Sequence, residues 1–147
     1  MSIWTHVAGI IRVDHIPSLA NEDVLDLTPD KELDFDTIMG KELRWEDDSD
    51  IWEDAEKHPE KYMPYGSEGS LQKSVWVNPH DSYVARYAVS IFGDLRCHQD
   101  VDGVIEWFKS VCSKVWVRNA TIVVENDMAG TKTWTYVEQE DEDNEQT

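Results

Sequence analysis

The sequence predicts an α+β protein in which an antiparallel sheet of about five strands is crossed by one well-defined helix. Residues 83–95 are rich in the aromatic and β-branched residues typical of strands, and an amphipathic helical pattern follows from residue 101. Further strand-like segments lie on either side of this pair. The chain has 147 residues, 40% of them hydrophobic, so it is long enough to bury one core and a single domain is expected.

The clearest element is a helix predicted over residues 101–114. Asp100 is well suited to cap its N-terminus, and Asp102 and Lys114 have the charge signs that the helix dipole favours at the two ends. Apolar residues recur at spacings of three and four, which places them on one face of the helix. These residues are Val101, Val104, Ile105, Phe108, Val111, Cys112 and Val115. This face is expected to pack on the sheet.

The first strand is predicted over residues 3–13. Gly9 in its middle indicates either a bulge or the close approach of a neighbouring strand. The other strands form two predicted hairpins, because polar and turn-forming residues separate them. The hairpins join residues 70–77 to 83–95 and residues 119–125 to 131–137.

The segment between the first strand and the first hairpin is less regular. Residues 21–30 are predicted to form a loop, and residues 28–45 carry an imperfect helical stripe of apolar side chains. Residues 51–55 are expected to add one short helical turn. The resulting order is strand, weak helix, hairpin, strong helix, hairpin, which predicts a ferredoxin-like plan with an extra edge strand and an acidic insertion.

Charge is distributed very unevenly along the chain, whose net charge is −18. Residues 21–60 hold sixteen acidic residues against four basic ones, and residues 138–147 hold six acidic residues and no basic one. The rest of the chain holds nine of each sign and is neutral. We therefore expect one domain over residues 1–137, with an acidic insertion at 21–60, followed by a disordered acidic tail at 138–147.

The sequence carries no recognisable catalytic, cofactor or metal motif. No two of its five histidines have a spacing typical of ligands on one element, and Asp47, Asp48 and Asp50 lack the glycine and glutamate of an EF-hand. No nucleophile elbow or phosphate loop is present. Direct nucleic-acid binding is disfavoured because the charge clusters are acidic. A non-enzymatic protein without cofactor or metal is expected.

The redox state and location of the protein are also predicted from its composition. Cys97 and Cys112 have no spacing that indicates a disulfide, so two reduced thiols are expected. The chain begins without a secretory signal, and no segment approaches the length of a membrane span. A cytoplasmic location is therefore predicted.

The acidic segment has two interpretations. It is either a solvated, partly mobile surface, or an array of carboxylates held in place by the apolar residues among them, such as Phe35, Ile51 and Trp52. A fixed array would imitate a phosphate backbone and bind a basic nucleic-acid channel. The residues predicted to contact a partner are Glu42, Trp45, Glu46, Asp47, Asp48, Asp50, Trp52, Glu53, Asp54 and Glu56.

In its acidic blocks at 21–60 and 138–147 and its compact core at 83–137, the chain resembles the small acidic proteins by which phages and mobile elements block host defence nucleases. These include anti-CRISPR proteins and DNA mimics. The resemblance implies a non-enzymatic inhibitor whose partner is a basic nucleic-acid-binding protein, above all a nuclease, and whose location is the host cytoplasm if the protein is phage-encoded. Two alternatives remain open, namely an immunity protein that neutralises a toxin nuclease and a small-ligand-binding or enzymatic α+β domain.

Overall fold

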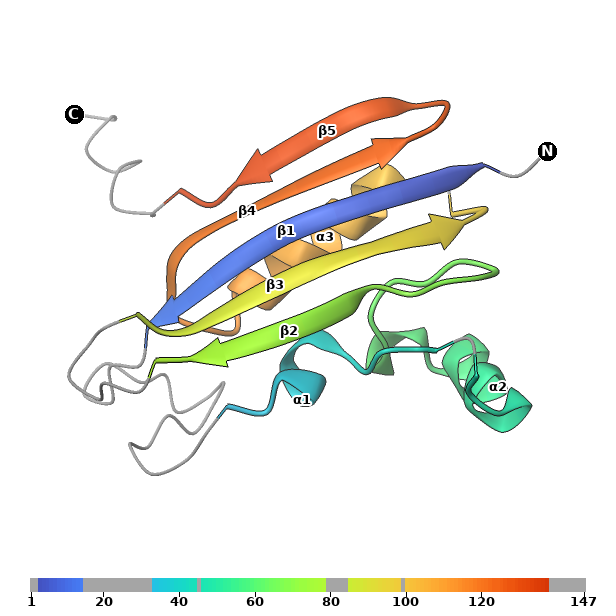
Figure 1. The fold of residues 1–147 in the computed structure, drawn as a ribbon, viewed down its shortest axis with the longest axis horizontal. Helices are drawn as coiled ribbons and strands as arrows, with labels where there is room; N and C mark the ends of the chain where they lie inside the picture. The colour runs from blue at the N-terminus through green and yellow to red at the C-terminus, as the bar shows by residue number, and fades with distance from the viewer. Residues whose placement is uncertain (1–2, 15–32, 45, 79–84, 99, 138–147) are drawn as a thin grey trace.

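The computed structural model describes residues 3–14, 33–44, 46–78, 85–98 and 100–137. Within these residues, five antiparallel strands form one sheet in the order β2-β3-β1-β4-β5 (Figure 1). The strands are β1 (Trp4–Asp14), β2 (Gln72–Val77), β3 (Ala85–Arg96), β4 (Val117–Asn126) and β5 (Gly130–Thr135). The predicted α+β class with an antiparallel sheet is confirmed.

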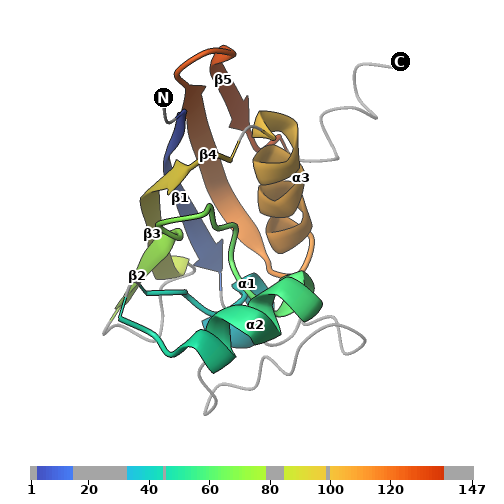
Figure 2. The ribbon, with the colours of Figure 1, turned by 90° about the vertical axis from the view of Figure 1, so that its right-hand side faces the viewer.

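The predicted strong helix is α3 (Val101–Cys112), which lies against one face of the sheet (Figure 2). The side chain of Asp100 caps its N-terminus by accepting a hydrogen bond from the backbone N–H of Gly103 at 2.8 Å. Phe108 is fully buried and packs edge-to-face on Trp134 of β5, with ring centroids 5.7 Å apart. The helix ends two residues before Lys114, whose ammonium donates instead to the carbonyl oxygen of Ile38.

The main core lies between the sheet and two helices, α1 (Phe35–Met39) and α3. Its buried side chains come from alternate positions of the strands, from one face of α3 and from α1. On β1 these are Val7, Ile11 and Val13, whereas Ala8, Ile10 and Arg12 point to the opposite, exposed face. The sheet therefore has one covered face and one that no described helix covers.

Gly9 is explained by the close approach of β4. A Cβ at this position would lie 3.0 Å from the carbonyl oxygen of Thr121 and 3.3 Å from the Cβ of Ile122. The pairing of β1 stays regular at Gly9, and its register shifts occur at the far end, around Val13. Of the two predicted explanations, close approach is the correct one.

Two predictions about the segment before β2 need correction. The helix expected to reach residue 45 is only α1 (Phe35–Met39) in the described residues, because Gly40 adopts a positive φ of 102° and Lys41 pairs with Tyr62 in an isolated bridge. The short turn expected at 51–55 is a longer helix, α2 (Ser49–Lys57), followed by a 3₁₀ turn, η2 (Pro59–Lys61). The described residues thus contain three α-helices, of which α3 is the predicted well-defined helix, while α1 is shorter and α2 longer than expected.

Several predicted features lie outside the described residues. They are the loop at 21–30, most of the hairpin turn at 78–82 and the acidic tail at 138–147. No helix in the described ranges is both long enough and apolar enough to cross a membrane.

Candidate functional site

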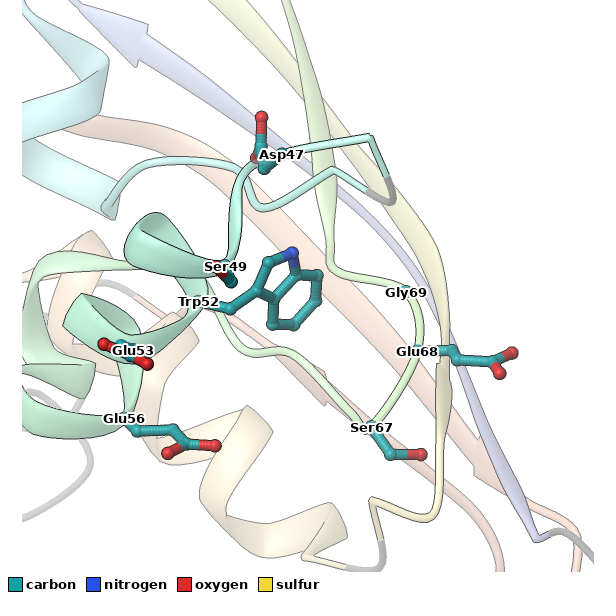
Figure 3. A pocket seen from close by; sticks show the side chains of 8 residues that line it. All are labelled: Asp47, Ser49, Trp52, Glu53, Glu56, Ser67, Glu68 and Gly69. Carbon is teal, nitrogen blue, oxygen red and sulfur yellow. The ribbon is translucent and has the colours of Figure 1, made fainter.

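An acidic cleft of about 450 Å³ opens between α2 and the turn formed by residues 67–69 (Figure 3). It is lined by Asp47, Ser49, Trp52, Glu53, Glu56, Ser67, Glu68 and Gly69. Four of these residues are acidic and none is basic. The cleft is therefore a negatively charged depression with one aromatic wall.

Trp52 provides that wall from a fixed position. Its side chain is half-buried against a second, smaller cluster formed by Leu43, Ala55 and Tyr62. Its ring also meets Tyr65 edge-to-face, with centroids 6.0 Å apart. Because one side of the indole is held by the body of the protein, the remaining side faces the cleft as a preformed apolar surface (Figure 3).

Helix α2 supplies the cleft with charge because it is strongly amphipathic. Ala55 is completely buried and anchors the helix, while Glu53 and Glu56 are exposed. Asp50 lies in the first turn and Lys57 in the last, so each end carries the sign that the helix dipole favours. Asp48 occupies the N-cap position, although its side chain makes no capping hydrogen bond.

The carboxylates of the cleft differ in their contacts. Asp47 accepts a hydrogen bond from the backbone N–H of Arg44 at 2.7 Å, and Glu68 forms an ion pair with Arg96 at 2.6 Å. Within the described residues, Glu53 and Glu56 form no ion pair. These two carboxylates are therefore available to a cation from outside.

The structure brings only some of the predicted partner-binding residues together. Asp47, Trp52, Glu53 and Glu56 meet at the cleft. Glu46, Asp48 and Asp50 are exposed but do not line it, and Trp45 lies outside the described residues. Glu42 and Asp54 are engaged with the body of the protein.

Glu42 and Asp54 hold the acidic segment in place. The Glu42 carboxylate accepts a hydrogen bond from the backbone N–H of Lys73 in β2 at 2.9 Å. Asp54 accepts one from the hydroxyl of Tyr62 at 2.6 Å, which lowers the pKa of Asp54 and raises the pKa of Tyr62 to about 12. Both contacts tie charged residues to the fold.

The other side of the cleft was missed from the sequence. Ser67, Glu68 and Gly69 belong to a glycine-containing turn that looked like an ordinary loop. Gly69 has a φ of 78°, and a Cβ there or at Gly66 would collide with the backbone of β3. The glycines thus let the turn pack closely on β3, which brings Glu68 to the cleft.

A second group of titratable side chains lies on the exposed face of the sheet. Ligand atoms of His6, Glu125 and Asp127 lie within 4.8 Å of one another. However, Nδ1 of His6 lies 2.7 Å from Asp94 Oδ1 and Nε2 lies 3.2 Å from Asp127 Oδ1. Both ring nitrogens of His6 therefore already have a carboxylate partner, and these hydrogen bonds to Asp94 and Asp127 raise the pKa of His6.

The cysteines are both free, as expected. Cys112 is buried in the main core, and burial raises the pKa of its thiol to about 12. Such a thiol is unreactive at neutral pH because the thiolate is the nucleophile. Cys97 is exposed and lies outside the cleft.

Comparison of the chain with protein-family models, with curated proteins and with solved structures finds no match in any of the three. The function of the cleft is therefore inferred from its geometry and its charge.

Proposed function

We propose that the protein is a non-enzymatic acidic inhibitor of the anti-CRISPR or DNA-mimic type. Its acidic face binds the basic nucleic-acid channel of a host defence nuclease or another nucleic-acid-binding protein, in the cytoplasm of the host. One observation carries this proposal: a cleft lined by acidic residues of α2 and of the 67–69 turn also presents the half-buried indole of Trp52 as a preformed aromatic surface. No cofactor, metal or catalytic group is required.

The spacing of charge on α2 supports mimicry of a nucleic acid. The helix has nine residues, among them Asp50, Glu53, Asp54 and Glu56. At 1.5 Å per residue it is about 13 Å long, so it carries roughly one acidic residue per 3.4 Å of its axis. One strand of B-DNA carries about one phosphate over the same length. A channel shaped for DNA would therefore meet a comparable density of negative charge, in which Asp50, Glu53 and Glu56 are exposed and Asp54 is held by Tyr62.

The cleft adds a site for a basic side chain of the partner. An arginine or lysine bound there would contact the Trp52 indole and ion-pair with Glu53 or Glu56. A cation held over an aromatic ring gains about 0.5 to 2 kcal/mol, and more when water is excluded. Tryptophan and arginine are frequent among the residues that dominate interface energies. The exposed carboxylates steer the encounter, and the cleft fixes the docked position.

The arrangement of the sheet is consistent with the proposed ferredoxin-like plan. β1 lies between β3 and β4, and β2 lies outside β3, with β5 added beside β4. The backbone carbonyl of Met39 in α1 accepts a hydrogen bond from the indole N–H of Trp107 in α3 at 3.0 Å, so both crossings lie on one face. We infer that the acidic segment is an insertion in the first crossing, between β1 and β2.

Two other functions fit parts of the same evidence. An immunity protein that neutralises a toxin nuclease would use the same acidic surface, and only the identity of the partner distinguishes it. A small-ligand-binding domain is favoured by the cleft volume of about 450 Å³, which lies in the usual range for small-molecule sites. Its charge restricts such a ligand to an organic cation.

The proposal is tested by competition with nucleic acid. A candidate nuclease is loaded with fluorescently labelled duplex DNA and titrated with this protein at low and at high salt. We expect displacement of the DNA and loss of cleavage, both weaker at high salt because exposed charges are screened. The double variant Glu53→Lys with Glu56→Lys should displace DNA far less effectively.

The matched control changes two acidic residues that lie away from the cleft. Asp102→Lys with Glu106→Lys, both exposed on α3, alters the net charge by the same amount. The control should compete almost as well as the native chain. A ternary complex of nuclease, DNA and this protein, or equal effects of the two double variants, would contradict the proposal.

A further inference from the structure

No described helix covers the face of the sheet opposite α3, which we call the open face (Figures 1 and 2). Four large side chains on it are substantially exposed, namely Ile10 at 39%, Trp76 at 55%, Phe92 at 55% and Val123 at 39%. Exposed tryptophan and phenylalanine side chains on one surface indicate an interaction site when they are contiguous.

The strand register shows that Ile10, Phe92 and Val123 are contiguous, whereas Trp76 of β2 pairs with Ala88 and so lies in the row of Arg12. Ala8 of β1 pairs with Phe92 of β3 on one side and with Val123 of β4 on the other, so these three form one row across the sheet. Ile10 occupies the next row, between Ser90 and Thr121. The centre of the open face is therefore an apolar patch that spans three strands.

Charge on the open face is polarised along β1. Arg12 lies at one end, in the row of Ala88 and Asn119. His6 lies at the other end, between Asp94 and Glu125. Arg12 and His6 are six positions apart along β1, a distance of about 20 Å in a strand. The face thus has a cation at one end, carboxylates at the other and an apolar centre.

The carboxylates at the His6 end outnumber its positive charge. Asp94 and Asp127 both contact the imidazole, and Glu125 makes no ion pair within the described residues. The described part of the chain also shows no ion pair for Arg12, which is exposed. Each end therefore offers an exposed charge to a partner.

We propose that the open face is the interface of a homodimer in which two sheets stack face to face. The two-fold axis runs across the strands, between the rows of Ala8 and Ile10. This operation places Arg12 of one copy over the His6 row of the other, within reach of Glu125, and Ile10 over Ala8. A second copy is the occupant because the charges of the face are complementary under this operation and the apolar rows of Ala8 and Ile10 lie over one another.

The expected dimer is weak and reversible. Five strands about 4.8 Å apart and four rows about 6.6 Å apart give a face of roughly 24 by 26 Å. Two copies would bury on the order of 1,200 Å², the lower end for specific interfaces. The net charge of −18 on each chain opposes association, so rising salt should strengthen the dimer. Binding through the acidic cleft should respond to salt in the opposite direction, so the two interfaces are separable.

Sedimentation equilibrium of the full chain tests the proposal. Arg12→Glu and Glu125→Arg should each weaken the dimer about tenfold or more, because each places like charges opposite one another. The double variant should restore association, since the pair is reformed with its signs exchanged. Phe92→Ser should also weaken the dimer by removing apolar contact. Lys57→Glu, which makes the same charge change on α2, should leave it nearly unchanged.

All these positions are exposed, so circular dichroism and thermal melting should show folded variants. A native chain that stays monomeric at hundreds of micromolar in both low and high salt would overturn the proposal. The same follows if Lys57→Glu weakens association as much as Arg12→Glu, or if the exchanged pair fails to restore it. None of these outcomes bears on the acidic cleft, since its lining includes no residue of the open face.

Discussion

The sheet with α3 and the segment with α2 are stabilised very differently. The main core lies between the sheet and α3. Its buried side chains come mainly from β1, β3, β4, α1 and α3. In the described residues, α2 and its neighbours bury only Leu43, Ala55 and Tyr62, with Trp52 and Tyr65 packed beside them. Of the net charge of −18, the segment 21–60, which includes α2, carries −12 (sixteen acidic against four basic residues), and residues 138–147 carry the other −6.

This difference separates stability from proposed function. Exposed carboxylates contribute little to the stability of the fold, and like charges that lie close together repel one another. A small apolar cluster and a few hydrogen bonds are enough to hold them in fixed positions on α2. We expect this segment to open locally at a lower free energy than the sheet.

The largest effect is expected in the main core. Phe108→Ala should lower the free energy of unfolding by about 3 to 5 kcal/mol, because Phe108 is fully buried against Trp134. Chemical denaturation measures the change. The same substitution at Phe92, which is 55% exposed, serves as the control and should cost much less. If the two variants have equal stability, the assignment of the covered face is wrong.

A smaller and more local effect is expected in the second cluster. Leu43→Ala should cost about 2 kcal/mol, the lower end for such a substitution, because the cluster around Leu43 is small. Amide hydrogen exchange should show the loss of protection in residues 49–57, while β1 and β4 keep theirs. A uniform loss of protection through the whole chain would show instead that the two regions unfold as one unit.

The hydrogen bond between Tyr62 and Asp54 should make the stability of the α2 region depend on pH. This hydrogen bond lowers the pKa of Asp54 in the folded protein. The stability that it contributes is therefore fully present above pH 3.8, the pKa of Asp54 in the unfolded chain, and is lost as the pH falls through the lower folded pKa. The same hydrogen bond raises the pKa of Tyr62 from 10.0 to about 12, so that contribution is present below 10.0 and is lost as pH rises toward 12.

Comparison of the native chain with Tyr62→Phe isolates this contribution. The difference in melting temperature should be constant between about pH 5 and pH 9 and should shrink beyond both limits. A difference that is independent of pH over the whole range would assign the role of Tyr62 to packing alone.

The smallest effect on stability is expected at the cleft itself. Glu53→Lys with Glu56→Lys should leave the melting temperature nearly unchanged, since both side chains are exposed and form no ion pair in the described residues. The proposed binding to a basic partner should nevertheless be lost. A large fall in melting temperature would show that these carboxylates belong to the fold.

The main fold was accessible from sequence because its signals are local. The spacing of apolar residues defines α3, and alternation with turn residues defines the strands. The end of α1 was not predictable, because Gly40 and Lys41 are set by their contacts with Tyr62, about twenty residues away. The length of α2 was underestimated because most of its residues are charged, and its helical pattern was judged from Ile51, Trp52 and Ala55 alone.

The cleft was only half predictable. Asp47, Trp52, Glu53 and Glu56 lie in one acidic segment, so composition was enough to select them. Glu68 joins them through the packing of a glycine turn on β3, which is a tertiary contact without a local signature. Composition also could not distinguish Glu42 and Asp54, whose carboxylates bond to the body of the protein, from acidic residues that face solvent.

The most direct test of the cleft is an NMR titration with a six-residue arginine peptide, following the indole N–H of Trp52. The resonance is assigned by its absence in Trp52→Phe. We predict a saturable shift that weakens as salt rises and is lost in the Glu53→Lys, Glu56→Lys variant. The matching citrulline peptide, which has the same shape without charge, should cause little shift. An unmoved Trp52 resonance, or equal shifts with both peptides, would contradict binding of basic side chains in the acidic cleft.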